Sequence, residues 1–298
     1  DAFARLIKTF GNTWNSYGIV AHSQGGAAAL HLYTYYWSGL DNASGGRLIQ
    51  SVGTPYKGTN LAGMLADLEA LPERTVAVLH ACCHNPTGYD LDDAQWDEVV
   101  DVLRQRQLIP VLDLAYQGFG NGLAQDRAAL DKLARAGVSF LVANSFSKNF
   151  SLYGERVGAL TVVCSDADEA GRVRSQLKVT VRTNYSNPPT HGAAVVTHIL
   201  RDPQLHALWE QELAGMRERV RTMRQKLVDG LAAAGATQDM GFMLRQLGMF
   251  SYSGLTLAQM QQLRTDHAVY GLDSGRLCVA ALNVGNIDQV AAAIAAVR

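Results

Sequence analysis

The chain has 298 residues, a hydrophobic fraction of 48% and a formal net charge of -1. This length allows one large domain or two ordinary ones, each with a substantial core. The sequence has no run of lysines and arginines, so it does not favour a nucleic-acid or acidic-membrane partner. Its apolar runs are also far shorter than a membrane span.

The cysteines indicate a reducing environment. None of the four stands in a C-x-x-C pattern or in a Cys/His spacing typical of a metal site, and two of them are adjacent: Cys82, Cys83, Cys164 and Cys278. We therefore expect reduced, buried thiols, no bound metal and a cytoplasmic location. The sequence shows no signal peptide and begins at Asp1 inside an amphipathic pattern, so we expect a fragment or a processed chain.

The first two thirds of the chain alternate between strands and helices. Short apolar stretches predict strands at 17–22, 47–52, 75–81, 108–115, 139–145 and 157–164. Helical patterns lie between them at 25–37, 63–71, 92–107 and 127–137. Continuous apolar strands separated by helices predict an α/β fold, with a mostly parallel sheet covered by helices on both faces.

The pattern changes after about residue 202. One long helical stretch covers 204–235, and shorter strands then alternate with helices near 256–266 and 286–297. We therefore predict a smaller C-terminal α+β domain attached to a long helix. The expected division is 1–62, 63–205 for the large domain, and 206–298 for the long helix and the small domain.

Polar side chains follow three of the predicted strands. They lie in "HACCHNPTG" (80–88), "DLAYQGF" (113–119) and "NSFSKNFSLYGER" (144–156). In a parallel sheet the carboxyl ends of the strands form the ligand site, so we expect these side chains to meet there. The candidate residues are Asn85, Asp113, Tyr116, Ser145, Lys148 and Arg156.

This set of residue types suits pyridoxal 5'-phosphate. A lysine amine with a lowered pKa can form a Schiff base with the aldehyde of that cofactor. A carboxylate beside the pyridine nitrogen keeps the nitrogen protonated, so that the ring withdraws electrons. Asparagine and tyrosine can hydrogen-bond the ring oxygen, while serine and arginine suit the phosphate. The same residues could also be ordinary polar loop residues if each is considered alone.

Residues 63–298 resemble the aspartate and aromatic amino-acid aminotransferases. The resemblance rests on "HNPTG", "DLAYQGF", "SFSKNFSLYGERVGA", "VRTNYSNPPTHGA", "GMFSYSGLT" and "DSGRLCVAALN". It implies that Lys148 carries the cofactor and moves the proton, and that Asp113 pairs with the pyridine nitrogen. Asn85 and Tyr116 would contact the ring oxygen, and Ser145 and Arg156 the phosphate.

The resemblance also implies substrate contacts and a dimer. Arg276 would bind the α-carboxylate of the amino acid with its planar guanidinium, a geometry that suits carboxylates better than ammonium does. Arg182 would reach the side-chain carboxylate in the site of a neighbouring subunit, so we expect a homodimer. His80 would lie near the cofactor ring. The substrates would be amino acids and 2-oxo acids.

Residues 1–62 depart from this family pattern. The N-terminal arm, the Gly-rich phosphate loop, the stacking aromatic residue and the tyrosine given to the partner are not found there. Instead, "IVAHSQGGAAALHLY" resembles the G-x-S-x-G elbow of α/β-hydrolase lipases, with Ala21 at the first glycine position. By this second resemblance Ser23 would be a nucleophile and Gln24 an oxyanion donor. We therefore expect a chimera in which a lipase-like βαβ segment completes the sheet.

Three functions remain open from the sequence. The first is pyridoxal-phosphate-dependent transamination of aromatic or dicarboxylic amino acids with a 2-oxo acid through Lys148, impaired or not by the altered N-terminal part. The second is a serine ester hydrolase that uses Ser23, although no lipase-like acid or histidine follows it. The third is an inactive chimeric scaffold.

Overall fold

The computed structural model describes residues 17–19, 47–49 and 61–298, with side chains described from residue 61 onward. Strands β1 (Tyr17–Ile19) and β2 (Arg47–Ile49) pair in parallel and form a two-stranded sheet. The helix expected at 25–37 and the elbow at Ser23 lie outside the described residues. That residues 1–62 complete the main sheet stays a prediction.

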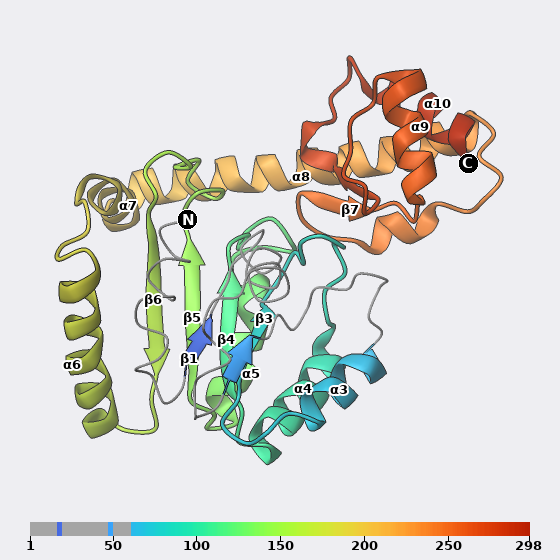
Figure 1. Ribbon diagram of the computed structural model, residues 1–298. Coiled ribbons are helices and arrows are strands. Elements are labelled where there is room, and N and C mark those ends of the chain that lie inside the picture. The colour runs from blue at the N-terminus through green and yellow to red at the C-terminus, as the bar shows by residue number, and fades with distance from the viewer. Residues whose placement is uncertain (1–16, 20–46, 50–60) are drawn as a thin grey trace.

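The main sheet has the strand order β3-β4-β5-β6, as Figure 1 shows. Its strands are β3 (Val76–His80), β4 (Ile109–Leu114), β5 (Phe140–Ser145) and β6 (Gly158–Val163). The first three are parallel, which confirms the predicted mostly parallel sheet, and β4 is buried along most of its length. Strand β6 runs antiparallel to β5, because the loop between them contains no helix to carry a parallel crossover.

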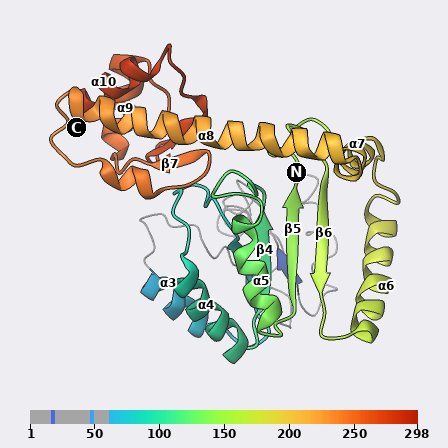
Figure 2. The ribbon, with the colours of Figure 1, turned by 180° about the vertical axis from the view of Figure 1, so that it is seen from behind.

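Three helices lie together on one face of this sheet, in views from opposite sides in Figures 1 and 2. They are α3 (Leu61–Glu69), α4 (Asp93–Gln105) and α5 (Ala128–Arg135). Helix α4 begins after a capping box formed by Asp92 and Gln95, and it buries Trp96, Val99 and Leu103 at helical spacing. This apolar stripe explains why the sequence pattern predicted the helix.

Two helices lie in a stretch for which the sequence predicted no element. They are α6 (Ala167–Asn184), beside the edge strand β6 in Figure 1, and α7 (His191–Arg201). Helix α6 buries none of its residues, so it lacks the apolar stripe on which helix prediction depends. Its start is fixed instead by the Asp166 side chain, which accepts a hydrogen bond from the backbone N–H of Glu169.

The long helix α8 (Pro203–Ala233) crosses above the ends of β3, β4 and β5 and continues into the C-terminal part (Figure 1). It gives Leu213 to the core around the sheet and Val220, Leu227 and Leu231 to a second core. Helix α8 therefore connects two separately packed cores.

Among the described residues, no helix has the length and apolarity needed to cross a membrane.

The second core lies between α8 and short elements of the C-terminal part. These are β7 (Phe250–Tyr252), α9 (Leu257–His267), β8 (Arg276–Cys278) and α10 (Ile287–Val297). Short 3-10 helices are η3 (Gln125–Arg127) in the large part, and η4 (Gly241–Arg245) and η5 (Val279–Ala281) in the small one. Strands β7 and β8 pair antiparallel, which places Tyr252 opposite Arg276.

Arg224 is a buried charge that ties α8 to the small part. Its guanidinium donates to the carbonyl oxygens of Gly248 and Phe250 and to the hydroxyl of Ser251, and burial lowers its pKa to about 10. We expect Arg224→Met to lower the free energy of unfolding by about 3 kcal/mol, because the buried acceptors lose their charged donor. Urea unfolding against Arg174→Met, on exposed α6, measures this. Equal losses would contradict the structural role of Arg224.

Candidate active site

The site lies where β3, β4 and β5 end. Asp113, near the end of β4, stands in register with His80 on β3 and with Ala143 on β5. Its residue is 5% exposed, and its carboxylate accepts a hydrogen bond from the backbone N–H of Ala115 at 3.1 Å. A carboxylate at this depth is costly unless it meets donors or a cation. Its position therefore suits a partner that carries a proton.

Asn85 connects both parts of the chain. It lies in the loop after β3, where its amide donates to the Tyr116 hydroxyl at 3.4 Å. Its side-chain oxygen accepts a hydrogen bond from Nη1 of Arg276 at 2.7 Å, although 191 positions separate the two residues. Gly88 allows the loop to approach the small part: its φ is +74°, and a Cβ there would lie 2.8 Å from the Phe250 carbonyl oxygen. The structure therefore brings Asn85, Tyr116 and Arg276 together.

Phe250 is a site residue for which the sequence analysis gave no role. The guanidinium carbon of Arg276 lies 4.3 Å from the centroid of its ring, and the ring meets that of Tyr116 edge to face at 6.1 Å. The guanidinium of Arg276 thus lies over an aromatic face while its Nη1 donates to Asn85. The motif "GMFSYSGLT" contained this residue, but a phenylalanine in a strand is normally attributed to the core.

Lys148 lies in the loop between β5 and β6. Trp209 of α8 fixes this loop, because its indole N–H donates to the Asn149 carbonyl at 2.7 Å and its ring stacks on Phe150 at 4.5 Å. The Lys148 amine lies 4.7 Å from the centroid of the Tyr116 ring. The lysine is thus held next to the Asn85–Tyr116–Arg276 group.

The surroundings of Lys148 make its amine more reactive. Burial lowers the pKa of Lys148 and nearby Arg156 lowers it further, whereas the Asp113 carboxylate acts in the opposite direction. A lower pKa leaves more of the amine neutral at a given pH, and only the neutral amine can attack an aldehyde. The charges of Asp113 and Arg156 therefore both act on Lys148.

Tyr116 keeps its proton over the whole physiological range. Burial raises the pKa of its hydroxyl to about 12, and the Asp113 carboxylate adds to this, while Asn85 and Arg276 oppose it. Tyr116 is 3% exposed. Its hydroxyl is therefore a hydrogen-bond donor at neutral pH rather than a base.

The remaining predicted residues lie around this centre in different ways. Ser145 ends β5, and its hydroxyl accepts from the backbone N–H of Ser147 at 3.3 Å. Arg156 is exposed in the same loop, where its Nη1 donates to the Tyr153 carbonyl at 3.1 Å. The ring of His80 meets that of His84 at 4.7 Å. That Ser145 and Arg156 hold a phosphate stays a prediction.

Among the described residues, Arg182 makes no hydrogen bond to Asn85, Tyr116 or Arg276 of its own chain. It is exposed near the end of α6 and donates to the Ser186 hydroxyl. Ser23, the alternative nucleophile, lies outside the described residues. Within its own chain, Arg182 therefore takes no part in the contacts described above.

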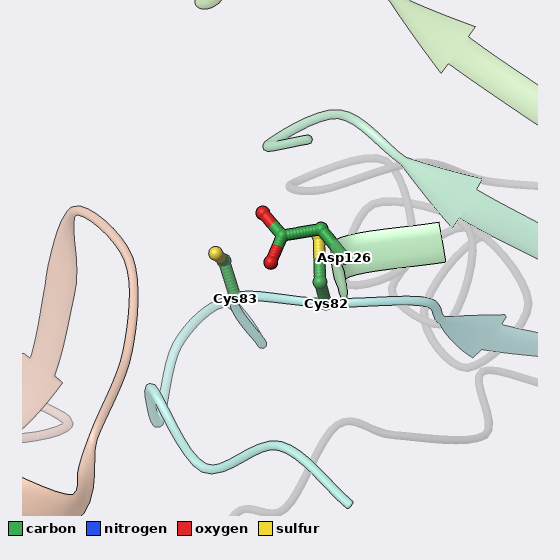
Figure 3. Close-up of side chains that lie close together, drawn as sticks. All are labelled: Cys82, Cys83 and Asp126. Atoms are coloured by element: carbon green, nitrogen blue, oxygen red, sulfur yellow. The ribbon is translucent and has the colours of Figure 1, made fainter. Parts of the chain in front are cut away.

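Two cysteines and an aspartate form a buried group under the site, shown in Figure 3. Cys82 and Cys83 follow β3, Asp126 comes from η3, and their potential ligand atoms lie within 4.8 Å of one another. No spacing or motif in the sequence indicated that these three residues meet. However, the Asp126 carboxylate accepts hydrogen bonds from the backbone N–H groups of Gly118, Gly120 and Asn121. The pKa of each thiol is also raised. The hydrogen bond between the two thiols raises the pKa of Cys82 and opposes the shift of Cys83, and burial raises the pKa of both. We therefore interpret the group as a structural brace of the loop after β4 and not as a metal centre.

The sequence matches the family pattern described as Aminotransferase class I and II over residues 21–294. Aspartate aminotransferase of Pseudomonas aeruginosa is 57% identical over 237 residues, which cover 80% of this chain and 60% of the relative. Tyrosine aminotransferase of Klebsiella pneumoniae is 49% identical over 285 residues, which cover 96% of this chain and 67% of the relative. The chain thus spans about two thirds of the length of these relatives or less.

A solved structure agrees with this assignment. The aromatic-amino-acid aminotransferase from Burkholderia pseudomallei, described as covalently bound to pyridoxal phosphate, superposes with a TM-score of 0.83 at 48% identity. The match covers 99% of this chain and 72% of that one. The family pattern also begins inside the segment 1–62, so the comparisons give no support to a lipase-like origin of that segment. The chain therefore belongs to the class I and II aminotransferase family.

Proposed function

We propose that the chain catalyses pyridoxal-phosphate-dependent transamination of aromatic or dicarboxylic amino acids with a 2-oxo acid. The observation that carries this proposal is the meeting of Lys148, Tyr116, Asn85 and Arg276 beside buried Asp113. Relatives named aspartate aminotransferase and tyrosine aminotransferase support the choice of substrates. The simplest test is the absorbance spectrum after pyridoxal phosphate is added: a new visible band supports the proposal, and an unchanged spectrum opposes it.

The residues present fit this cofactor in chemical type. Its ring supplies an electron sink when its nitrogen is protonated, and the buried Asp113 carboxylate would hold that proton. Tyr116 and Asn85 offer an O–H and an N–H donor to the ring oxygen, and the raised pKa of Tyr116 keeps its proton in place. Lys148, with its lowered pKa, would supply the amine that holds the cofactor and would carry the proton at the substrate α-carbon.

Arg276 would bind the α-carboxylate of every amino-acid substrate. Its guanidinium is held by Asn85 and by the ring of Phe250. We expect Arg276→Lys to raise KM by about tenfold to a hundredfold for all amino acids alike, because an ammonium cannot form the bidentate pair. Steady-state kinetics with aspartate and phenylalanine measure this, with Arg264→Lys on α9 as the matched control. A loss for one substrate class alone would remove Arg276 from this role.

We also propose that Arg182 acts in the site of a second copy in a homodimer. Exposed apolar side chains on β6 and α6 support an interface there: Leu160 is 54% exposed and Val179 56%. Arg182→Ala should then weaken dicarboxylic substrates about tenfold more than aromatic ones, because only the former have a second carboxylate. Sedimentation checks the dimer. Equal losses for both substrates, or a monomer, would contradict this proposal.

Two interpretations of residues 1–62 remain predictions. A chimeric origin has two sequence patterns in its favour, the elbow around Ser23 and the stretch "RLIQSVGTPYKGTNLAG" (47–63), and the hydrolase alternative receives no support from the comparisons. Covalent labelling of Ser23 by a fluorophosphonate would support the hydrolase alternative. A cytoplasmic location remains a proposal too, supported by the fact that all four cysteines are free thiols.

A further inference from the structure

The loop that carries Asn85 is held by one carboxylate. Asp90 accepts a hydrogen bond from the backbone N–H of Cys83 at 2.6 Å through Oδ2 and another from His84 at 2.8 Å through Oδ1. These two N–H groups immediately precede Asn85 in the chain. The backbone hydrogen bonds between β3 and β4 stop before these two groups, since the last of them joins the Ala81 N–H to the Asp113 carbonyl. Asp90 thus replaces the sheet at the point where the loop begins.

The backbone has the shape that such an anion requires. Cys83 has a φ of +52°, which is strained for a residue with a side chain. A left-handed residue in a turn can direct successive N–H groups to the same side, where they form a concave site for an anion. Both oxygens of Asp90 occupy this concavity. Although burial raises the pKa of Asp90 to about 6, the carboxylate is ionised at neutral pH.

The neighbouring contacts transmit this constraint to Asn85. Within the loop, the Gly88 N–H donates to the His84 carbonyl at 2.7 Å, and the Thr87 hydroxyl lies 2.7 Å from Nδ1 of His84. His84 is therefore fixed by Asp90 on one side and by the rest of the loop on the other. Asn85 lies between His84 and Thr87 in the chain. Its amide donates to Tyr116 and its side-chain oxygen accepts from Arg276.

We infer that Asp90 is a positioning residue for the cofactor and substrate contacts of Asn85, acting through the backbone of residues 83 and 84. This inference rests on the proposed function. Asp90 touches neither Tyr116 nor Arg276 by any hydrogen bond found among the described residues, so its influence passes through the loop. Its removal leaves two N–H groups without their charged acceptor and a strained Cys83 without the contact that offsets the strain.

The test is a double-mutant cycle on the dissociation constant of pyridoxal phosphate, followed by the visible absorbance of the bound cofactor. We expect Asp90→Asn to raise this constant about tenfold, because one amide oxygen cannot accept both N–H groups and the amide hydrogens face one of them. Asn85→Ala should raise it at least as much. In the Asn85→Ala background, Asp90→Asn should add less than twofold, since Asp90 then has nothing left to position.

Asp92→Asn is the matched control. Asp92 lies two positions later and accepts from the backbone N–H of Gln95 at 2.9 Å, so it makes the same kind of bond but caps α4 instead. Because asparagine caps a helix about as well as aspartate, this variant should leave stability nearly unchanged, and it should change neither cofactor affinity nor absorbance. If Asp90→Asn does not fold, Asp90→Glu, which keeps both oxygens but displaces them, enters the same cycle with the same expectation.

The possible failures are distinguishable. If Asn85→Ala weakens the cofactor but the Asp90 variants do not, or if the two effects multiply in the double variant, the inference on Asp90 is wrong and the proposed function stands. If Asn85→Ala has no effect on cofactor binding, the role of Asn85 is wrong, and the inference fails with it. Thermal unfolding of every variant separates loss of the fold from loss of positioning.

Discussion

Lys148→Ala should lower the transamination rate by at least about 10³-fold, since the variant loses both the nucleophile and the group that moves the proton. The structure supports this expectation, because Lys148 has a lowered pKa and lies over the Tyr116 ring beside Asp113. The measurement is the single-turnover rate with aspartate and phenylalanine. Binding of the cofactor should persist in part, because the contacts of the other residues remain.

The control for this variant is Lys178→Ala, which removes an exposed lysine from α6. Its rate should equal that of the parent chain. Added methylamine should restore part of the Lys148→Ala rate, because a small amine can take the place of the missing side chain as a proton carrier. A Lys148→Ala rate within tenfold of the parent would contradict the role given to this lysine.

Asp113→Asn should reduce the transamination rate by about 10²–10³-fold while the protein remains folded. The amide has nearly the same shape but cannot hold the proton of the cofactor nitrogen, so the ring withdraws electrons less strongly. Its side-chain oxygen can still accept the hydrogen bond of the Ala115 N–H. The loss should therefore appear in the chemical step rather than in the melting temperature.

Asp101→Asn on the exposed face of α4 controls for the loss of one negative charge, since Asp101 forms a surface ion pair with Arg104. A cofactor analogue that carries a permanent positive charge on the ring nitrogen should recover activity in Asp113→Asn. Full activity of Asp113→Asn with the ordinary cofactor would mean that the carboxylate does not control the ring.

Much of the large part of the fold was predictable from the sequence. Strands β3, β4 and β5 are short apolar runs and α4 has a regular apolar stripe, so local patterns agree with the final structure. The antiparallel direction of β6 was not predictable, because its apolar residues are the same whichever way it runs. Helix α6 was missed because it buries no side chain.

The sequence indicated the polar residues of the candidate site, but it did not indicate the residues that support them. Lys148, Asp113, Tyr116 and Asn85 could be placed because the ends of neighbouring parallel strands meet. Arg276 followed from the family resemblance alone, since no local pattern brings together residues 191 positions apart. The role of Phe250 depends on contacts with residues far away in the chain, and that of Asp90 on the folding of its own loop. Neither periodicity nor spacing can reveal such contacts.

The most direct test of the central claim is to reduce the cofactor onto the chain with borohydride and to map the modified peptide by mass spectrometry. The proposed function predicts one pyridoxyl group, on the peptide that contains Lys148, and no such group in Lys148→Ala. A modification on another lysine with Lys148 unmodified, or no modification in a chain that binds the cofactor, would contradict it.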